Sequence, residues 1–454
     1  MMRSMFSGVS GLRVHQTKMD VIANNISNVN TTGFKSSRVT FAEIFAQTTR
    51  GASAANDNTG RGGTNPMQIG LGTTVASIDL STVQGAAQRT DNPYDLMIQG
   101  EGFFIVGDDS GVKFTRAGAF TLDEAGNFVN PSGLKVYGWD RKWNEENADW
   151  EIERGQVQPI TISGDKWYAP PATTTQIDFT DNLNAVEDGA DGFSMQFNFY
   201  DSLGNRFVGT ITFQLPDDGG VDAGSTTWNY TISPEVYLAG DTDATYTVDF
   251  ATTSGTVVFG TNGLVQSITP PGADANDFRV PVAATTITPE DGSPTLPAST
   301  LGNDANQIVF DFGGLTQFGD KKTNATSEHA DGHGPGALIN VSVGTDGIIT
   351  GLYSNSELAI LGQIPVATFK NPAGLEKAGD SLYLPSANSG EFDGIGEEIA
   401  ATGGKIMGGV LEMSNVDLSQ EFTEMITTQR GFQANSRIIT TSDEMLQELV
   451  NLKR

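Results

Sequence analysis

Residues 5–29, MFSGVSGLRVHQTKMDVIANNISNV, and residues 418–450, LSQEFTEMITTQRGFQANSRIITTSDEMLQELV, both carry apolar side chains at the heptad spacing of a coiled coil. The apolar residues of the first stretch, called the N-terminal seam, are Met5, Leu12, Met19, Ile22, Ile26 and Val29. Those of the second stretch, called the C-terminal seam, are Leu418, Phe422, Met425, Phe432, Ile439, Leu446 and Val450. A narrow stripe of this kind is buried only against another helix, in the same chain or in a neighbouring copy. We therefore predict helices at both ends that pair as a coiled coil, with ordinary core helices of a globular domain as the alternative.

The sequence also signals where these helices begin and end. Residues 24–33 are rich in Asn, Ser and Thr, whose side chains compete for backbone hydrogen bonds, and Gly33 allows a stop. Asp417 is predicted to cap the second helix, with the Gln420 side chain reaching back to it. Gly431 lies inside that helix, where glycine costs about 1 kcal/mol relative to alanine, and this indicates a bend or a close helix contact.

The chain between the two helices is typical of β-structure. Apolar residues alternate with polar ones on both sides of a turn at residues 201–205, first at Phe193, Met195, Phe197 and Phe199, then at Phe207, Ile211, Phe213 and Leu215. This pattern predicts a hairpin with one buried face. Further strands are predicted at 228–232, 246–250 and 256–259, and a β-rich stretch at 337–368. Residues 34–70, rich in Gly, Ala, Asn and Thr towards their end, indicate a linker or an extended arm.

The charge is strongly and unevenly acidic. The 454 residues carry a formal net charge of −29, which argues against a nucleic-acid partner, because phosphate binding needs a basic surface. Residues 1–50 hold six Lys or Arg against two Asp or Glu, whereas residues 409–454 hold four against seven. Opposite signs on the two terminal segments favour their pairing modestly, and the acidic body limits indiscriminate association.

Cysteine and long apolar runs are absent from the sequence. With no cysteine, thiol catalysis and thiolate metal sites are excluded. The first 20 residues lack the uninterrupted apolar segment of a secretory signal, and no run of about 18 apolar residues predicts a membrane span. We therefore expect no membrane insertion, and export without a cleaved signal peptide if the protein works outside the cell.

Two motifs resemble those of a known family. Ala23-Asn-Asn-Ile-Ser-Asn-Val-Asn-Thr-Thr-Gly-Phe-Lys35 is similar to the N-terminal signature of bacterial flagellar axial proteins, the rod, hook and hook-associated subunits. Residues 414–435, SNVDLSQEFTEMITTQRGFQAN, and the ending LQELVNLKR resemble the C-terminal counterpart. The matching signature residues are Asn24, Asn25, Ile26, Ser27, Asn28, Gly33, Phe34, Asn415, Asp417, Gln429 and Arg430. The resemblance covers roughly residues 1–145 and 335–454, and only patches of the centre.

The resemblance implies a fold and a domain order. The fold is expected to be mainly β with terminal α-helices that pair as a coiled coil, and with two or three consecutive β-domains between them, the outer ones inserted into the inner one. Residues 1–33 and 409–454 would form the helical domain, and 34–70 the linker or arm. Residues 71–150 and 336–408 would form the inner β-domain, and 151–335 the outer variable β-domains.

The resemblance also implies a function. Among axial subunits the large central insertion favours the hook type, a structural subunit that self-assembles into the tubular joint between the motor with its rod and the filament. A distal-rod-like or hook-associated subunit is the alternative. The implied partners are other copies of the chain, the distal rod, hook-associated junction proteins, the hook cap and the flagellar type III export apparatus. The implied location is the extracellular flagellar hook and basal body.

Catalytic and metal-binding residues are expected to be absent, as are cofactors. Of the three histidines, His15 lies on the N-terminal seam, where a packed or pH-sensitive interface residue is favoured over a catalyst. His329, Asp331 and His333 alternate and could hold a metal in principle, but the glycines and Pro335 around them predict a turn. A β-rich binding or hydrolytic protein with oligomerisation helices remains the second hypothesis, and it would keep its activity after both termini are deleted.

Overall fold

The computed structural model describes residues 2–54, 62–108, 110–144, 149–184, 192–216, 221–222, 225–239, 241–270, 278–289, 300–302, 307–319 and 322–452. The chain divides into two compact units. Unit 1 contains Met1–Ser163, Val341–Gly351 and Ala359–Arg454, and unit 2 contains Gly164–Asn340 and Leu352–Leu358.

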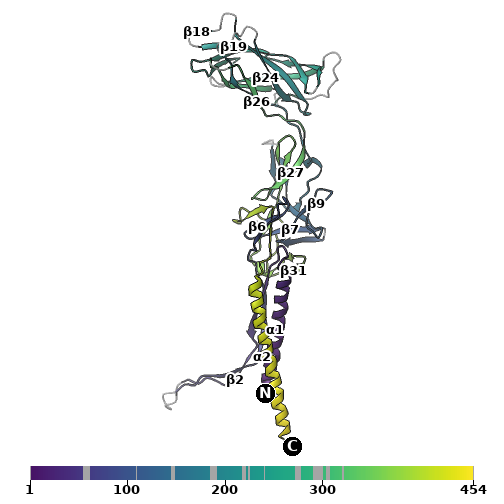
Figure 1. Cartoon of the computed structure of the whole chain (residues 1–454), viewed down its shortest axis with the longest axis vertical. Helices are drawn as coiled ribbons and strands as arrows, with labels where there is room; N and C mark the ends of the chain where they lie inside the picture. The colour runs from purple at the N-terminus through teal and green to yellow at the C-terminus, as the bar shows by residue number, and fades with distance from the viewer. Residues whose placement is uncertain are drawn as a thin grey trace. The chain divides into compact units, whose positions relative to one another are not determined.

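The two long helices of unit 1 come from opposite ends of the chain. Helix α1 spans Met2–Ser27 and helix α2 spans Leu418–Asn451. They pack side by side and antiparallel, since residues early in α1 contact residues late in α2 (Figure 1). This confirms the predicted terminal helices and their pairing within one chain. No described helix is long and apolar enough to cross a membrane.

The predicted helix ends agree with the structure except at Gln420. Helix α1 stops in the polar run, where the Asn28 side chain donates to the backbone carbonyl of Asn24 at 2.9 Å. Asp417 caps α2 by accepting from the backbone N–H groups of Ser419 and Gln420. The expected reach-back of Gln420 is wrong, because its amide donates instead to Glu424 one turn later, at 3.3 Å.

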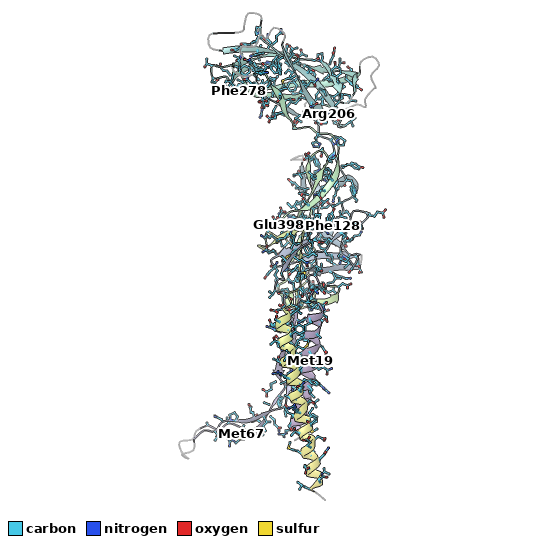
Figure 2. The ribbon with its side chains drawn as sticks, viewed as in Figure 1. Met19, Met67, Phe128, Arg206, Phe278 and Glu398 are labelled. Atoms are coloured by element: carbon cyan, nitrogen blue, oxygen red, sulfur yellow. The ribbon has the colours of Figure 1, made fainter. Side chains whose placement is uncertain are left out.

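Strands next to the helices anchor them to the β-part of unit 1. β1 (Ser37–Glu43) pairs antiparallel with β4 (Thr73–Leu80), and β2 (Ala46–Arg50) pairs with β3 (Met67–Gly70) as a ribbon that runs away from the helices and carries Met67 (Figures 1 and 2). β5 (Ala87–Arg89) pairs with β34 (Val410–Glu412), and β6 (Leu96–Gln99) with β33 (Lys405–Gly408). The segment predicted as a linker or arm therefore contains β1, β2 and β3.

The main sheet of unit 1 is built around the hairpin of β7 (Phe103–Asp108) and β8 (Gly111–Thr115). On one side follow β32 (Leu382–Leu384) and β31 (Glu376–Gly379), and on the other β11 (Lys135–Asn144) and β29 (Leu358–Gln363). Smaller strands of the same sheet include β9 (Thr121–Leu122), β10 (Phe128–Val129), β12 (Asp149–Ile152), β13 (Gln158–Pro159) and β30 (Val366–Ala367). Its core includes Phe103, Ile105, Phe114 and Tyr383.

Unit 2 contains a 12-stranded sheet, and buried apolar residues from its strands form one core cluster. Its main strand order is β23-β22-β19-β17-β20-β21-β24-β25-β15-β26. The strands are β15 (Gln176–Asn182), β16 (Phe193–Tyr200), β17 (Arg206–Gln214), β18 (Val221–Asp222), β19 (Ser225–Ile232), β20 (Glu235–Leu238), β21 (Asp241–Phe250), β22 (Ser254–Phe259), β23 (Val265–Thr269), β24 (Arg279–Pro289), β25 (Gln307–Thr316) and β26 (Thr326–Ala330). The strands β14 (Tyr168–Ala169), β27 (Gly336–Val343) and β28 (Ile348–Tyr353) include or lie within a few residues of the sequence positions where the chain passes from one unit to the other.

The predicted hairpin is confirmed as β16 and β17, which pair antiparallel over their whole length. Met195, Phe197 and Phe199 are buried, and so are Phe207, Ile211 and Phe213 on the partner strand. The aromatic rings continue into β25, where Phe310 lies 5.3 Å from Phe197 between ring centroids. The strands predicted at 228–232, 246–250 and 256–259 fall within β19, β21 and β22.

Candidate assembly site

The face that α1 turns to α2 is made mostly of small and polar residues, with the aliphatic Val14 and Ile22 among them. Gly8, Gly11, Val14, Ile22 and Asn25 are buried, with His15 and Lys18 half-buried on the same 3-4 spacing. On α2 the corresponding residues are Glu421, Glu424, Thr428, Gly431, Asn435, Ile439, Ser442 and Leu446. The contact is thus close and largely polar, unlike the leucine-rich interface of a typical coiled coil.

Glycines allow the two helices to approach closely. A Cβ atom at Gly11 would lie 2.6 Å from the side chain of Asn435, and one at Gly431 would lie 2.9 Å from the ring of His15. The predicted close contact at Gly431 is therefore confirmed. His15 also lies edge-on to Phe41 of β1, with 6.0 Å between ring centroids.

Charged groups pair across the two helices. Lys18 Nζ lies 3.1 Å from a carboxylate oxygen of Glu424, and Asn25 donates to Glu421 at 2.9 Å. Burial acts to raise the pKa of Glu424, but hydrogen bonds from Lys18 and Gln420 outweigh it and lower that pKa. Burial raises the pKa of Glu421, and burial together with Lys18 lowers the pKa of His15. Each group therefore depends on its neighbours across the helix pair.

The structure places the seam residues beside this contact face more often than in it. Met5, Leu12, Met19, Ile26 and Val29 are half-buried, and only Ile22 is fully buried; Met19 is labelled on α1 in Figure 2. In the C-terminal seam, Met425, Phe432, Ile439 and Leu446 are half-buried, whereas Leu418, Phe422 and Val450 are exposed. The heptad pattern thus predicts helical faces, but within one chain glycines occupy the closest contacts.

Large apolar side chains remain exposed on the helices. The exposed fraction is 51% for Phe422 and 53% for Ile426, and it reaches 68% for Phe6 on α1. Leu418, Phe422 and Ile426 are spaced by four residues and so form one stripe. The other exposed apolar residues of the two helices are Val9, Ile438, Met445 and Val450. An exposed apolar area of this kind is characteristic of a surface that binds another protein.

Two asparagines of the family signature form hydrogen bonds at the base of the helix pair, the end where α1 stops and α2 starts. The Asn25 amide donates to the backbone carbonyl of Ser37 at 2.9 Å and accepts from the backbone N–H of the same residue at 3.0 Å. Asn415 accepts from the N–H of Ser36 at 2.8 Å and donates to the carbonyl of Ser81 at 2.9 Å. Each amide replaces a missing backbone partner, which fixes where β1 begins relative to both helices.

A buried group of three charges lies next to these amides. Lys35, Glu412 and Arg116, called the base triad, are at most 5% exposed. A Glu412 carboxylate oxygen lies 2.6 Å from Lys35 Nζ and accepts from the backbone N–H of Gly85 at 2.9 Å. The other oxygen lies 3.5 Å from the Arg116 guanidinium. Because Lys35 follows α1 and Glu412 precedes α2, the triad joins both helices to the β-part of unit 1.

Other signature residues have distinct local roles. Gly33 has φ +67°, and a Cβ there would lie 2.4 Å from the backbone nitrogen of Ala117, so glycine is required. The Phe34 ring lies below the Lys377 ammonium at 4.9 Å, and burial lowers the pKa of that lysine. Ser27 donates to the carbonyl of Ala23. Asn24, Gln429 and Arg430 are exposed on the helices.

Sequence reasoning did not identify the base triad. Lys35 ends the N-terminal motif, but Glu412 and Arg116 are single charges roughly 300 residues apart, in separate parts of the chain. A charged residue on an otherwise apolar strand such as β34, with sequence VLE, was the one available signal.

The residues of the alternating His-Asp-His motif have different partners. Asp331 accepts hydrogen bonds from the backbone N–H groups of Thr175 and Gln176 at 2.7 and 3.0 Å. His333 Nδ1 lies 3.0 Å from the Asn355 amide, and its Nε2 lies 3.8 Å from Glu357. The His329 side chain lies outside the described residues. Asp331 thus fixes the backbone where β15 begins, and His333 contacts a neighbouring turn through Asn355.

Four family descriptions match successive parts of the chain. "Flagella basal body rod protein" matches residues 5–35, and "Flagellar hook protein FlgE/F/G D1 domain" matches residues 97–182. "Flagellar basal body protein FlaE D2 domain" matches residues 169–333, and "Flagellar basal body rod FlgEFG protein C-terminal" matches residues 407–452. The first and last of these cover α1 and α2 with the base of the helix pair.

Full-length relatives match from end to end. The flagellar hook protein FlgE of Borreliella burgdorferi is 38% identical over 472 residues, covering 100% of both chains. That of Treponema pallidum is 37% identical over 476 residues, again covering 100% of both. The flagellar basal-body rod protein FlgG of Bacillus subtilis is 30% identical over 454 residues, with 100% of both covered. With these relatives and a fold that pairs its two ends, the chain belongs to the flagellar hook protein family and is a structural subunit of the hook.

Proposed function

We propose that copies of this chain polymerise into the hook tube by burying the exposed apolar stripes of α1 and α2 against neighbouring copies. The observation that carries the proposal is the contrast between the two faces of the helix pair. The inner face is mostly small and polar, whereas Phe6, Phe422 and Ile426 are more than half exposed. Burying an exposed Phe or Ile fully is worth about 1.5–3 kcal/mol, so a few such residues supply a strong contact.

The seams and the domain order form part of the same proposal. The other apolar residues of the N-terminal and C-terminal seams would face other copies, since they flank the intramolecular contact to which Ile22, Ile439 and Leu446 belong. Residues 1–33 with 409–454 would form the helical domain, and 34–70 the arm. Residues 71–150 with 336–408 would form the inner β-domain, and 151–335 the outer one. The match of the D2 description to residues 169–333 supports the last assignment.

The proposed partners follow from a position in the hook. Besides further copies, the chain would contact the distal rod, hook-associated junction proteins and the hook cap. It would reach the extracellular hook through the flagellar type III export apparatus, without a cleaved signal peptide. We propose a mechanical role and no enzymatic one. A rod-like position is the second candidate, favoured by the 30% identical rod protein of Bacillus subtilis.

Replacing Phe422 with Asp tests the assembly proposal. The residue is 51% exposed, so the isolated subunit should keep its fold, whereas a charge buried between copies costs several kcal/mol. We expect light scattering and electron microscopy to show no tubes at concentrations where the parent chain forms them. Thr423→Asp is the matched control, since Thr423 is exposed on the same helix. Tubes of normal yield from Phe422→Asp would overturn the proposal.

A further inference from the structure

The buried guanidinium of Arg116 has too few acceptors. An arginine has five N–H donors, but only the bond to the Gly100 carbonyl, at 2.8 Å, has ordinary length. The contacts to the Ile98 carbonyl and to Glu412 are 3.4 and 3.5 Å long. Its Nε–H is buried and finds no acceptor among the described residues. Leaving buried donors without acceptors costs free energy, so binding of a further acceptor to this guanidinium would be favourable.

A cavity adjoins this guanidinium. It has a volume of about 330 Å³ and is lined by Arg116, Lys35, Gln84, Gly102, Phe103 and Thr368, among others. The Phe103 ring lies 5.3 Å from the guanidinium carbon, covering one flat face of the group. Since the N–H bonds lie in the guanidinium plane, a ring against the face does not block them, and the Nε–H still has no acceptor among the described residues. A planar acceptor with two oxygens matches that geometry best.

The charges around the cavity are unbalanced. Two buried cations, Lys35 and Arg116, share one buried carboxylate, Glu412. Burial lowers the pKa of Lys35 and of Arg116, although Glu412 acts in the opposite direction on both. Glu101, exposed at the rim, also acts on Arg116. A second negative charge would stabilise two buried cations that share a single anion.

We propose that this cavity binds a carboxylate group, which the Arg116 guanidinium holds as the missing anion of the base triad. The volume admits an acetate ion or the end of an Asp or Glu side chain. Two sources share this chemistry: a free small carboxylate, and an acidic side chain of a second copy of the chain. The second source rests on the proposed self-assembly. The first does not.

The test measures acetate binding to the full chain, kept at concentrations where light scattering shows monomer. Saturation-transfer NMR should detect sodium acetate at the protein, and acetate should raise the unfolding temperature more than chloride does at equal ionic strength. Thr368→Leu narrows the cavity without replacing a residue of the triad, and it should abolish both effects. Glu101→Gln removes a like charge from the rim and should strengthen binding several-fold. Arg89→Lys, at an exposed arginine, should change neither effect.

Arg116→Lys should weaken acetate binding, because an ammonium group cannot offer two parallel donors. Equal effects of acetate and chloride, or an acetate effect that survives Thr368→Leu, would overturn the proposal even if Arg116→Lys proved too unstable to study. The assembly assay then separates the two sources. If a second copy supplies the carboxylate, acetate should slow tube formation by the parent chain at matched ionic strength. If a free carboxylate is the ligand, acetate binds with no effect on assembly.

Discussion

Replacing Glu412 with Gln should loosen the attachment of both helices to unit 1. Glutamine keeps the size of the side chain but removes the charge that faces Lys35 at 2.6 Å and Arg116 at 3.5 Å. Breaking a buried ion pair from one side costs about 3–5 kcal/mol. Because the Arg116 contact is long, we take the lower end, about 3 kcal/mol, which is about a 100-fold change in an equilibrium constant at 1.4 kcal/mol per factor of ten.

Hydrogen exchange followed by mass spectrometry can measure this change segment by segment. Peptides covering β5, β34 and β6 should exchange about 100-fold faster in Glu412→Gln, whereas peptides from unit 2 should be unchanged. Glu376→Gln, at an exposed position of β31, is the matched control. Replacing all three charges together, with Lys35→Met, Arg116→Met and Glu412→Leu, should recover much of the lost stability. A change below threefold in the β5 and β34 peptides would refute the role given to the triad.

Two further predictions concern the contact between the helices. Gly431→Leu places a side chain where even a Cβ would lie 2.9 Å from His15, so amide exchange in the helices should accelerate despite the better helix propensity of leucine. Ala434→Leu, at an exposed position, is the control, and equal protection of the two variants would contradict the close contact. The lowered pKa of His15 means that the unfolded helix binds the proton more readily. Stability should therefore fall as pH drops below about 6.5, the usual histidine value, and level off below the folded pKa. His15→Gln should remove this dependence, and an unchanged pH profile of helix exchange in that variant would show that another group titrates.

Sequence reasoning predicted the helices well and their contact less well. Heptads of apolar residues identify helices with a buried face, but they do not distinguish contacts within a chain from contacts between chains. Leu12 and Met19 match the pattern better than Gly11 and His15, yet the latter pair lies at the closest contacts with α2. Glycine contributes nothing to an apolar pattern, and its effect appears only when the distance between two backbones is known.

In the β-part, too, features set by neighbouring residues were predicted, whereas features set by residues far apart in the sequence were not. The alternation in β16 and β17 is local and predicts a hairpin correctly. The base triad depends on three charges brought together by strand pairings far apart in the sequence. The predicted reach-back of the Gln420 side chain was wrong for a local reason, because Glu424 one turn later offers its amide a competing acceptor. The predicted cap at Asp417 was correct because its side chain accepts only from backbone N–H groups at the start of its own helix.

The polar inner face of the helix pair has a thermal consequence. If the exposed apolar side chains of α1 and α2 become buried between copies, the free energy of tube growth is mostly hydrophobic. Such burial is entropic near 25 °C and has a large negative heat-capacity change. Assembly would then be strengthened by warming and weakened by cooling. A subunit would remain a monomer in the cold and join the tube at growth temperature, without any change in its own covalent structure.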